Sequence, residues 1–70
     1  MTVRLAIINA LETKYEAQIA EAQATIKIYM ENSVGIGEHP QHLDEMDKLF
    51  EKIATAKEKL QTLEPYRGEE

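Results

Sequence analysis

This chain of 70 residues contains no cysteine and no tryptophan, and it has only three glycines and two prolines. Without cysteine it can form neither disulfides nor a thiolate metal site, which are common supports of a chain too short to bury a large core. Its stability must therefore come from helix packing, within the chain and between copies of it. The absence of cysteine also fits a reducing, cytosolic setting.

Long apolar runs and an excess of positive charge are missing as well. No stretch approaches the roughly 20 apolar residues that span a bilayer, so we expect no membrane partner. The segment from Val3 to Ile8 contains Arg4 and precedes no small-residue cleavage site, so we expect that it is not a signal peptide. Thirteen acidic against eight basic side chains give a net charge of -5. This balance opposes binding to a nucleic acid backbone.

The first of two helical patterns is expected from Thr2, a residue type that caps helices, to Asn32. Its large apolar residues recur with alternating gaps of three and four, with Leu11 or Glu12 filling the one missing step. This is the spacing of a coiled-coil stripe. They are Leu5, Ile8, Tyr15, Ile19, Ala22, Ile26 and Tyr29. We expect this large-residue stripe to pack inside a helical hairpin.

A second stripe, of small side chains, lies on nearly the opposite side of the same helix. Its members are Val3, Ala6, Ala10, Thr13, Ala17, Ala20 and Ala24. Small residues let another backbone approach closely, so this small-residue seam predicts packing between subunits, with Ile7 and Ile28 beside it. Alternatively, the alanines merely fill a surface that faces solvent.

The second helical pattern is expected from Pro40 to Glu64. Proline is favourable at the first helical position because the amide there has no partner inside the helix, and Pro65 is expected to end the helix. The apolar positions again alternate gaps of three and four, and Phe50 is expected to widen their stripe. They are Met46, Leu49, Ile53, Ala56, Leu60 and Leu63. Residues 65–70 would then form a short tail.

These patterns predict an all-α fold in which residues 1–70 form one domain. Residues 33–39 join the helices as an antiparallel hairpin, and hairpins assemble in a coiled-coil-like manner into a homo-oligomeric helical bundle. Because the second helix is expected to be the shorter one, the apolar run from Val3 to Ile8 should be partly uncovered at the open end. Exposed apolar surface of this kind marks an interface.

The connection between the helices contains residues that helix packing does not explain. Gly35 and Gly37 permit close backbone approach, and the amides before the second helix face outward at its positive end, where a phosphate or carboxylate can bind. With Ile36 and His39 they predict a site for a small anionic ligand. Alternatively, Gly35 only ends the first helix, Val34 and Ile36 plug the core, and His39 caps the second helix.

Metal binding and catalysis have weaker support in the sequence. His39 and His42 are three residues apart with acidic neighbours, but a metal site needs three or four convergent ligands. We therefore expect no metal, with His39 at the helix start and His42 in solvent. Because no nucleophile or paired carboxylate identifies a catalytic site, we expect neither an enzyme nor a cofactor.

The end of the hairpin opposite the loop collects Arg4, Tyr66 and Arg67, which an antiparallel arrangement brings near one another. Arginine and tyrosine can clamp a phosphate and stack on a base. Alternatively, Tyr66 and Arg67 are solvated tail residues. Lys27 interrupts the small-residue seam near the loop, where it either faces a ligand between subunits or extends to water.

The string from Asn32 to Pro40 reads NSVGIGEHP and precedes an acidic helix. In this half the chain resembles a family of small uncharacterised proteins encoded by tailed bacteriophages, in which a loop close to NPVGIGEHP joins two helices. Ser33 stands where that loop has proline. The resemblance implies a phage origin and a host-cytoplasmic site of action, and no settled activity comes with it.

By analogy with small, acidic, oligomeric phage proteins, we expect an anti-defence protein. It would be a sponge that sequesters a nucleotide immune signal, either a cyclic oligonucleotide or an ADP-ribose-derived molecule, without catalysis. The expected ligand-binding residues are Gly35, Ile36, Gly37, His39, Lys27, Arg4, Tyr66 and Arg67. The alternative is an oligomeric coiled-coil adaptor or inhibitor that binds a host or virion protein.

Overall fold

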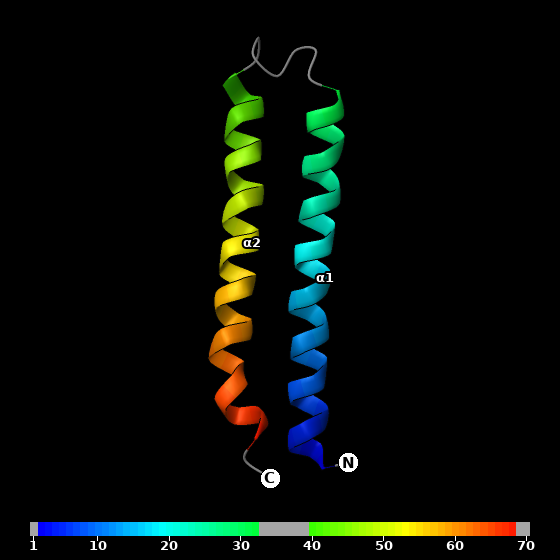
Figure 1. The fold of residues 1–70 in the computed structure, drawn as a ribbon, viewed down its shortest axis with the longest axis vertical. Coiled ribbons are helices and arrows are strands. Elements are labelled where there is room, and N and C mark those ends of the chain that lie inside the picture. Colours follow the sequence, from blue (N-terminus) through cyan, green and yellow to red (C-terminus); the bar gives the residue numbers. More distant parts are fainter. Residues whose placement is uncertain (1, 33–39, 69–70) are drawn as a thin grey trace.

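A computed structural model describes residues 2–32 and 40–68 of the chain. These residues form two α-helices, α1 (Val3–Glu31) and α2 (Pro40–Arg67), and contain no strand. The helices lie side by side and run antiparallel, so that the start of α1 and the end of α2 lie at the same end of the molecule (Figure 1). The result is a rod of 52 × 16 × 13 Å. The predicted all-α hairpin is confirmed.

Helix α1 begins as the sequence predicts. The hydroxyl of Thr2 accepts a hydrogen bond from the amide of Leu5 at 3.1 Å, which satisfies one of the donors that a helix start leaves without an intrahelical partner. At the other end, the Asn32 side-chain amide donates to the carbonyl oxygen of Ile28 at 3.0 Å. Side chains therefore cap both ends of α1.

Helix α2 begins at Pro40 as predicted, but its predicted end at Glu64 is wrong. The helix continues through Pro65 to Arg67, so Tyr66 and Arg67 belong to its last turn and not to a tail. Proline has no backbone N–H to donate, and its ring crowds the preceding turn of a helix. Near a helix end a proline interrupts few hydrogen bonds. Contacts with α1 hold the last turn of α2 in place.

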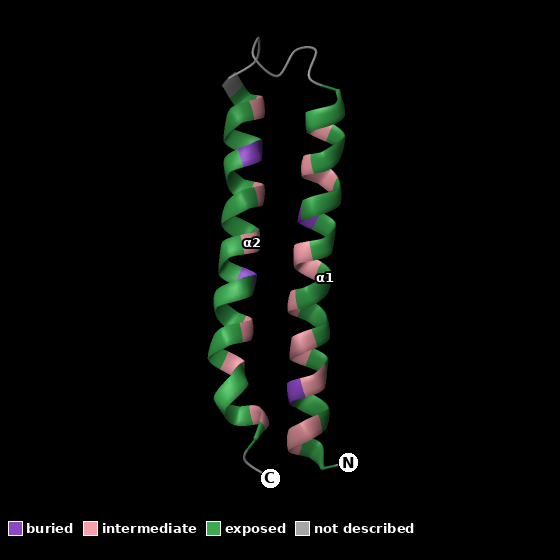
Figure 2. Ribbon diagram, in the orientation of Figure 1, coloured by how far each residue is buried: buried purple, intermediate pink, exposed green. Residues whose placement is uncertain are grey.

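The large-residue stripe predicted for each helix faces the other helix. Four of its residues form the most buried part of the core, with exposed fractions of 5% for Ile8, 1% for Ala22, 8% for Met46 and 1% for Ala56. The remaining stripe residues are half-buried. Figure 2 shows these positions along the facing sides of α1 and α2. Phe50 departs from the prediction, because 52% of it is exposed and it does not widen the core.

The small-residue seam of α1 is exposed along its whole length. At the open end, Val3 is 77% and Ile7 is 55% exposed, although α2 is almost as long as α1, with 28 residues against 29. The expected overhang of α1 is therefore wrong, and these side chains are exposed because they point away from α2. Within the described residues, the small-residue seam of α1 faces away from α2 and stays exposed.

Candidate functional site

The open end of the hairpin brings together the residues that the sequence placed there. A guanidinium nitrogen of Arg4, Nη2, donates to the carbonyl oxygen of Tyr66, so the start of α1 contacts the last turn of α2. The Tyr66 side chain stays 55% exposed. The predicted proximity of Arg4 to Tyr66 is confirmed, and the Tyr66 ring is open to solvent.

Arg67 does not extend into solvent as a tail residue would. Its Nη2 lies 2.9 Å from Oε2 of Glu12, and the two side chains are 31% and 37% exposed. Its Nη1 donates to Oδ1 of Asn9 at 3.4 Å. An anion at Arg67 would have to compete with the Glu12 carboxylate, so this arginine is better placed to hold the last turn of α2 than to bind a phosphate.

A shallow groove of about 200 Å³ adjoins these residues on one side of the hairpin. It is lined by Tyr15, Glu58, Lys59, Thr62, Leu63 and Tyr66. The ammonium of Lys59 lies 5.5 Å from the centre of the Tyr15 ring, within the range of a cation–π interaction. The groove thus joins two aromatic rings and a cation from both helices.

Sequence reasoning missed Lys59 as a functional residue and assigned Tyr15 to the core. Tyr15 does face α2, but it is only half-buried and forms one wall of the groove. The signal that could have found this pair is the register of the antiparallel helices. Lys52 pairs with Glu21, and in antiparallel helices six positions before Glu21 on α1 lie level with six to seven positions after Lys52 on α2, which are Tyr15 and Lys59.

The loop end of the hairpin carries a separate set of residues. The rings of Tyr29 and His42 meet edge to face with their centres 5.7 Å apart. The expectation that His42 lies in solvent is therefore wrong, because it packs against α1 and is half-buried. Lys27 is exposed there. Gly35, Ile36, Gly37 and His39 lie outside the described residues.

Within one hairpin, the predicted ligand-binding residues do not form one site. Lys27 follows Arg4 by 23 positions of α1, which corresponds to about 35 Å at the rise of an α-helix. Lys27 is therefore at the opposite end of the rod from Arg4, Tyr66 and Arg67. A site that uses both ends needs a second copy of the chain.

A small exposed apolar patch lies near the loop end, formed by Met30, Leu43 and Phe50. Their exposed fractions are 58%, 60% and 52%. Tyr29 and His42 face each other, and in antiparallel helices the next residue of each turns toward the same side, which places Met30 beside Leu43. Phe50 follows Leu43 by seven residues and lies on the same helix face.

Other classes of site find no support in the part of the chain that the structure describes. Among residues 2–32 and 40–68, no three histidine or acidic side chains are grouped so that they could hold a metal ion. Neither α1 nor α2, over their described residues, has the length and apolar character needed to cross a membrane.

Comparisons of the chain with protein-family models, with curated proteins and with solved structures gave no match. The resemblance of its loop to phage proteins accordingly stays a prediction. Any functional proposal has to rest on the geometry of the hairpin and on the chemistry of its exposed groups.

Proposed function

We propose that this protein is a non-catalytic, homo-oligomeric sponge that sequesters a small nucleotide in the cytoplasm of a phage-infected host. The proposed ligand is an immune signal, either a cyclic oligonucleotide or an ADP-ribose-derived molecule. Trapping requires tight binding at many copies of one site but no reacting group. The observation that carries the proposal is the groove near the open end of the hairpin, where the rings of Tyr15 and Tyr66 and the cation of Lys59 come together from both helices.

The chemistry of this groove suits a nucleotide. Lys59 supplies a cation for phosphate oxygens, with Glu58 beside it in the lining, and Arg4 lies next to the groove at the carbonyl oxygen of Tyr66. The exposed ring of Tyr66 offers a face on which a base can stack. Arg67 contributes indirectly, because its pairing with Glu12 at 2.9 Å keeps the last turn of α2, and with it Tyr66, against α1. The glycine loop is a further candidate contact, on the sequence evidence alone.

The size of the groove supports a site that is shared between subunits. At about 200 Å³ it is smaller than the roughly 300–1,000 Å³ of pockets that enclose a small ligand. One base or one phosphate fits it, and the remainder of a dinucleotide would need a second surface. A neighbouring hairpin would supply that surface.

The exposed face of α1 supports the assembly. The molecule has a solvent-accessible surface of 5313 Å², whereas a compact monomer of 8.0 kDa is expected to have roughly 4,450 Å². The small-residue seam and the flanking Ile7 and Ile28 lie outside the hairpin core and contribute to this exposed surface. Association of hairpins would cover this face.

Native mass spectrometry tests both parts of the proposal. The purified protein is measured alone and with cyclic dinucleotides, cyclic trinucleotides and cyclic ADP-ribose isomers. We expect a defined oligomer that gains a fixed number of ligand masses, set by its symmetry. An oligomer that ignores every member of the panel contradicts the sponge, whereas a monomer contradicts the assembly.

Two exposed aromatic residues give a matched pair of variants for locating the site. Tyr66 is 55% and Phe50 is 52% exposed, but only Tyr66 lines the groove. We expect Tyr66→Ala to abolish nucleotide binding and Phe50→Ala to leave it unchanged, with both variants folded. Equal binding by the two variants would place the ligand elsewhere.

The second candidate function is an oligomeric adaptor or inhibitor that binds a host or virion protein. The exposed patch of Met30, Leu43 and Phe50 favours it, because aromatic and methionine side chains are enriched at protein interfaces. The same pair of variants separates the two functions. An adaptor would lose its protein partner in Phe50→Ala and keep it in Tyr66→Ala, which is the reverse of the result expected for the sponge.

A further inference from the structure

Four residues beside the small-residue seam form a column whose charges are complementary to those of the same column read in reverse. Ile7, Lys14, Glu21 and Ile28 are spaced by seven residues along α1, in the order apolar, cation, anion, apolar. All four are exposed in the hairpin. At this spacing they share one side of the helix, so any partner that covers the seam also meets this column.

We propose that α1 docks on α1 of a second copy in antiparallel orientation, about a two-fold axis near residues 17 and 18. This inference rests on the assembly part of the proposed function. In an antiparallel pair related by such an axis, the column of one copy faces the column of the other copy, with the order of its residues reversed. Each Lys14 then meets Glu21 of the second copy, and each Ile7 meets Ile28 of the second copy.

Charge complementarity selects this orientation over the parallel one. In a parallel pair, each seam residue faces its own counterpart, so Lys27 would meet Lys27 of the second copy inside an apolar interface, where like charges are unfavourable. In the antiparallel pair, Lys27 instead lies near the start of the other α1, among small residues. Opposite charges meet in the middle of the facing columns, and isoleucines meet at both ends of them.

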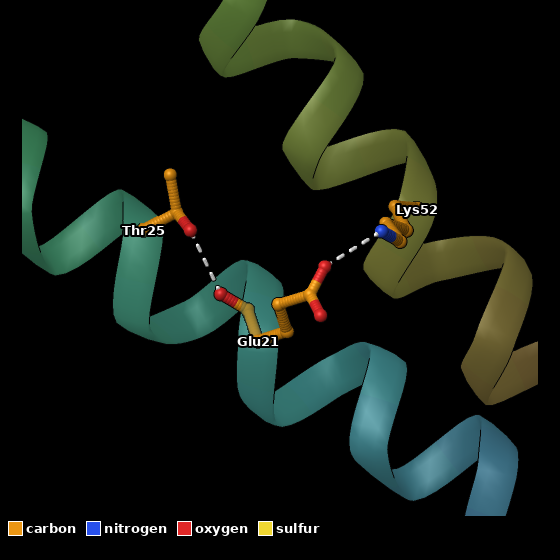
Figure 3. A network of polar contacts seen from close by, with 3 residues as sticks. All are labelled: Glu21, Thr25 and Lys52. Carbon is orange, nitrogen blue, oxygen red and sulfur yellow. Dashed lines mark hydrogen bonds and ion pairs between the residues drawn. The ribbon is translucent and has the colours of Figure 1, made fainter.

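The internal contacts of Glu21 leave room for this pairing. Its Oε1 lies 3.2 Å from the ammonium of Lys52 on α2, while its side chain stays 74% exposed. Figure 3 shows the second carboxylate oxygen of Glu21 turned away from Lys52. Glu21 can therefore hold Lys52 within its own hairpin and accept a hydrogen bond from Lys14 of the second copy.

The antiparallel arrangement also brings two of the predicted ligand-binding residues, Lys27 and Arg4, close together. Lys27 of one copy falls level with position 8 of the other, about 6 Å along the axis from Arg4 of that copy. The loop end of each hairpin thus lies beside the open end of its partner. The dimer has two equivalent ends of this kind, and each contains residues from both copies.

Cross-linking tests the orientation directly, because the chain has no cysteine of its own. The variants Ile7→Cys and Ile28→Cys are purified separately and treated with a short bis-maleimide, alone and as a mixture. We expect dimers to be trapped only in the mixture. Trapping of Ile7→Cys with itself would show a parallel pair and overturn the inference while leaving the assembly intact.

Sedimentation equilibrium of the unmodified protein separates the remaining outcomes. A monomer would remove the assembly part of the proposed function and the inference with it. An oligomer that neither mixture nor single variant can cross-link would place the interface on another face and overturn only the inference.

Charge reversal supplies an independent check in the full-length chain. Lys14→Glu creates two like-charge contacts per antiparallel dimer and is expected to raise the dimer Kd about tenfold at low salt, and less at high salt. Lys14→Glu combined with Glu21→Lys restores opposite charges between the copies, and adding Lys52→Glu keeps an opposite charge beside position 21 within the hairpin. This triple variant should recover most of the affinity. Lys48→Glu on α2 makes the same charge change as Lys14→Glu away from the column and should leave the Kd unchanged. Failure of the triple variant to recover contradicts the Lys14–Glu21 pairing.

Discussion

Nη2 of Arg67 lies 2.9 Å from Oε2 of Glu12, so an ion pair ties the last turn of α2 to the middle of α1. Pro65 precedes this turn and would ordinarily favour its unwinding. The contact of Arg4 with the carbonyl oxygen of Tyr66 acts on the same turn from the start of α1. Cross-helix contacts explain why the helix persists past the proline.

Removing this ion pair should loosen the open end selectively. Both side chains are about one-third exposed, so solvent screens the interaction and we expect Glu12→Gln to lower the free energy of unfolding by only about 0.5–1 kcal/mol. Hydrogen exchange should become faster at the amides of Tyr66 and Arg67 than elsewhere in α2. Urea denaturation and hydrogen-exchange mass spectrometry measure the two effects.

Glu16→Gln is the matched control, because Glu16 lies one turn further along α1 and is exposed. We expect it to change the free energy of unfolding by less than about 0.5 kcal/mol. If both variants behaved alike, the ion pair would not be what holds the last turn.

The hairpin itself could be predicted from the sequence because its signals are local and repeated. Thr2 capped α1, and the alternating gaps of three and four identified the facing sides that Ile8, Ala22 and Ala56 now occupy. The predicted helix end at Glu64 was wrong because the effect of Pro65 was judged from its neighbours in sequence alone. The ion pair that holds the last turn joins Arg67 to Glu12, which are 55 residues apart in sequence. Long-range contacts override local preference where a single turn is at stake.

The two most buried alanines should not tolerate larger side chains. Ala56 is 1% exposed between the helices, so Ala56→Leu forces them apart and is expected to cost about 1–3 kcal/mol of stability. Ala54→Leu, two residues away on the exposed side of α2, should change stability by less than about 0.5 kcal/mol. Thermal and urea unfolding of both variants check this, and equal destabilisation would contradict the assigned core face.

The small-residue seam of α1 and the core between the helices should respond differently to a charge. Ala17 is exposed in the seam, so Ala17→Glu is expected to dissociate the assembly and leave the helices formed. Ile53 faces α1, and Ile53→Asp is expected to unfold the hairpin because a charge in a small core has no partner. Sedimentation and circular dichroism distinguish the two results.

Thr55→Glu, at an exposed position of α2, controls for added negative charge and should keep both the assembly and the fold. An unchanged assembly mass for Ala17→Glu would show that the seam is not an interface.

The candidate site was less predictable than the fold. Arg4, Tyr66 and Arg67 could be placed at one end because they lie at the chain ends of an antiparallel hairpin. The contact of Lys59 with Tyr15 and that of His42 with Tyr29 depend on the register of one helix against the other. A seven-residue pattern fixes which face is buried but leaves that register open by whole turns.

Reversing one charge in the groove should affect ligand binding without affecting the fold. Lys59 is exposed and lies 5.5 Å from the centre of the Tyr15 ring. We expect Lys59→Glu to change the free energy of unfolding by no more than about 1 kcal/mol, because an exposed cation–π contact contributes little. The same variant should weaken binding of an anionic nucleotide at least tenfold, since it replaces an attraction to phosphate by a repulsion.

Lys57→Glu makes the same change in net charge two residues away, at an exposed position that does not line the groove. Isothermal titration with the nucleotide that native mass spectrometry detects compares the two variants. Loss of binding in Lys59→Glu alone means that a local contact with Lys59 attracts the ligand. Equal losses in both variants mean that the overall charge of the protein governs binding, and the groove would then have no special role.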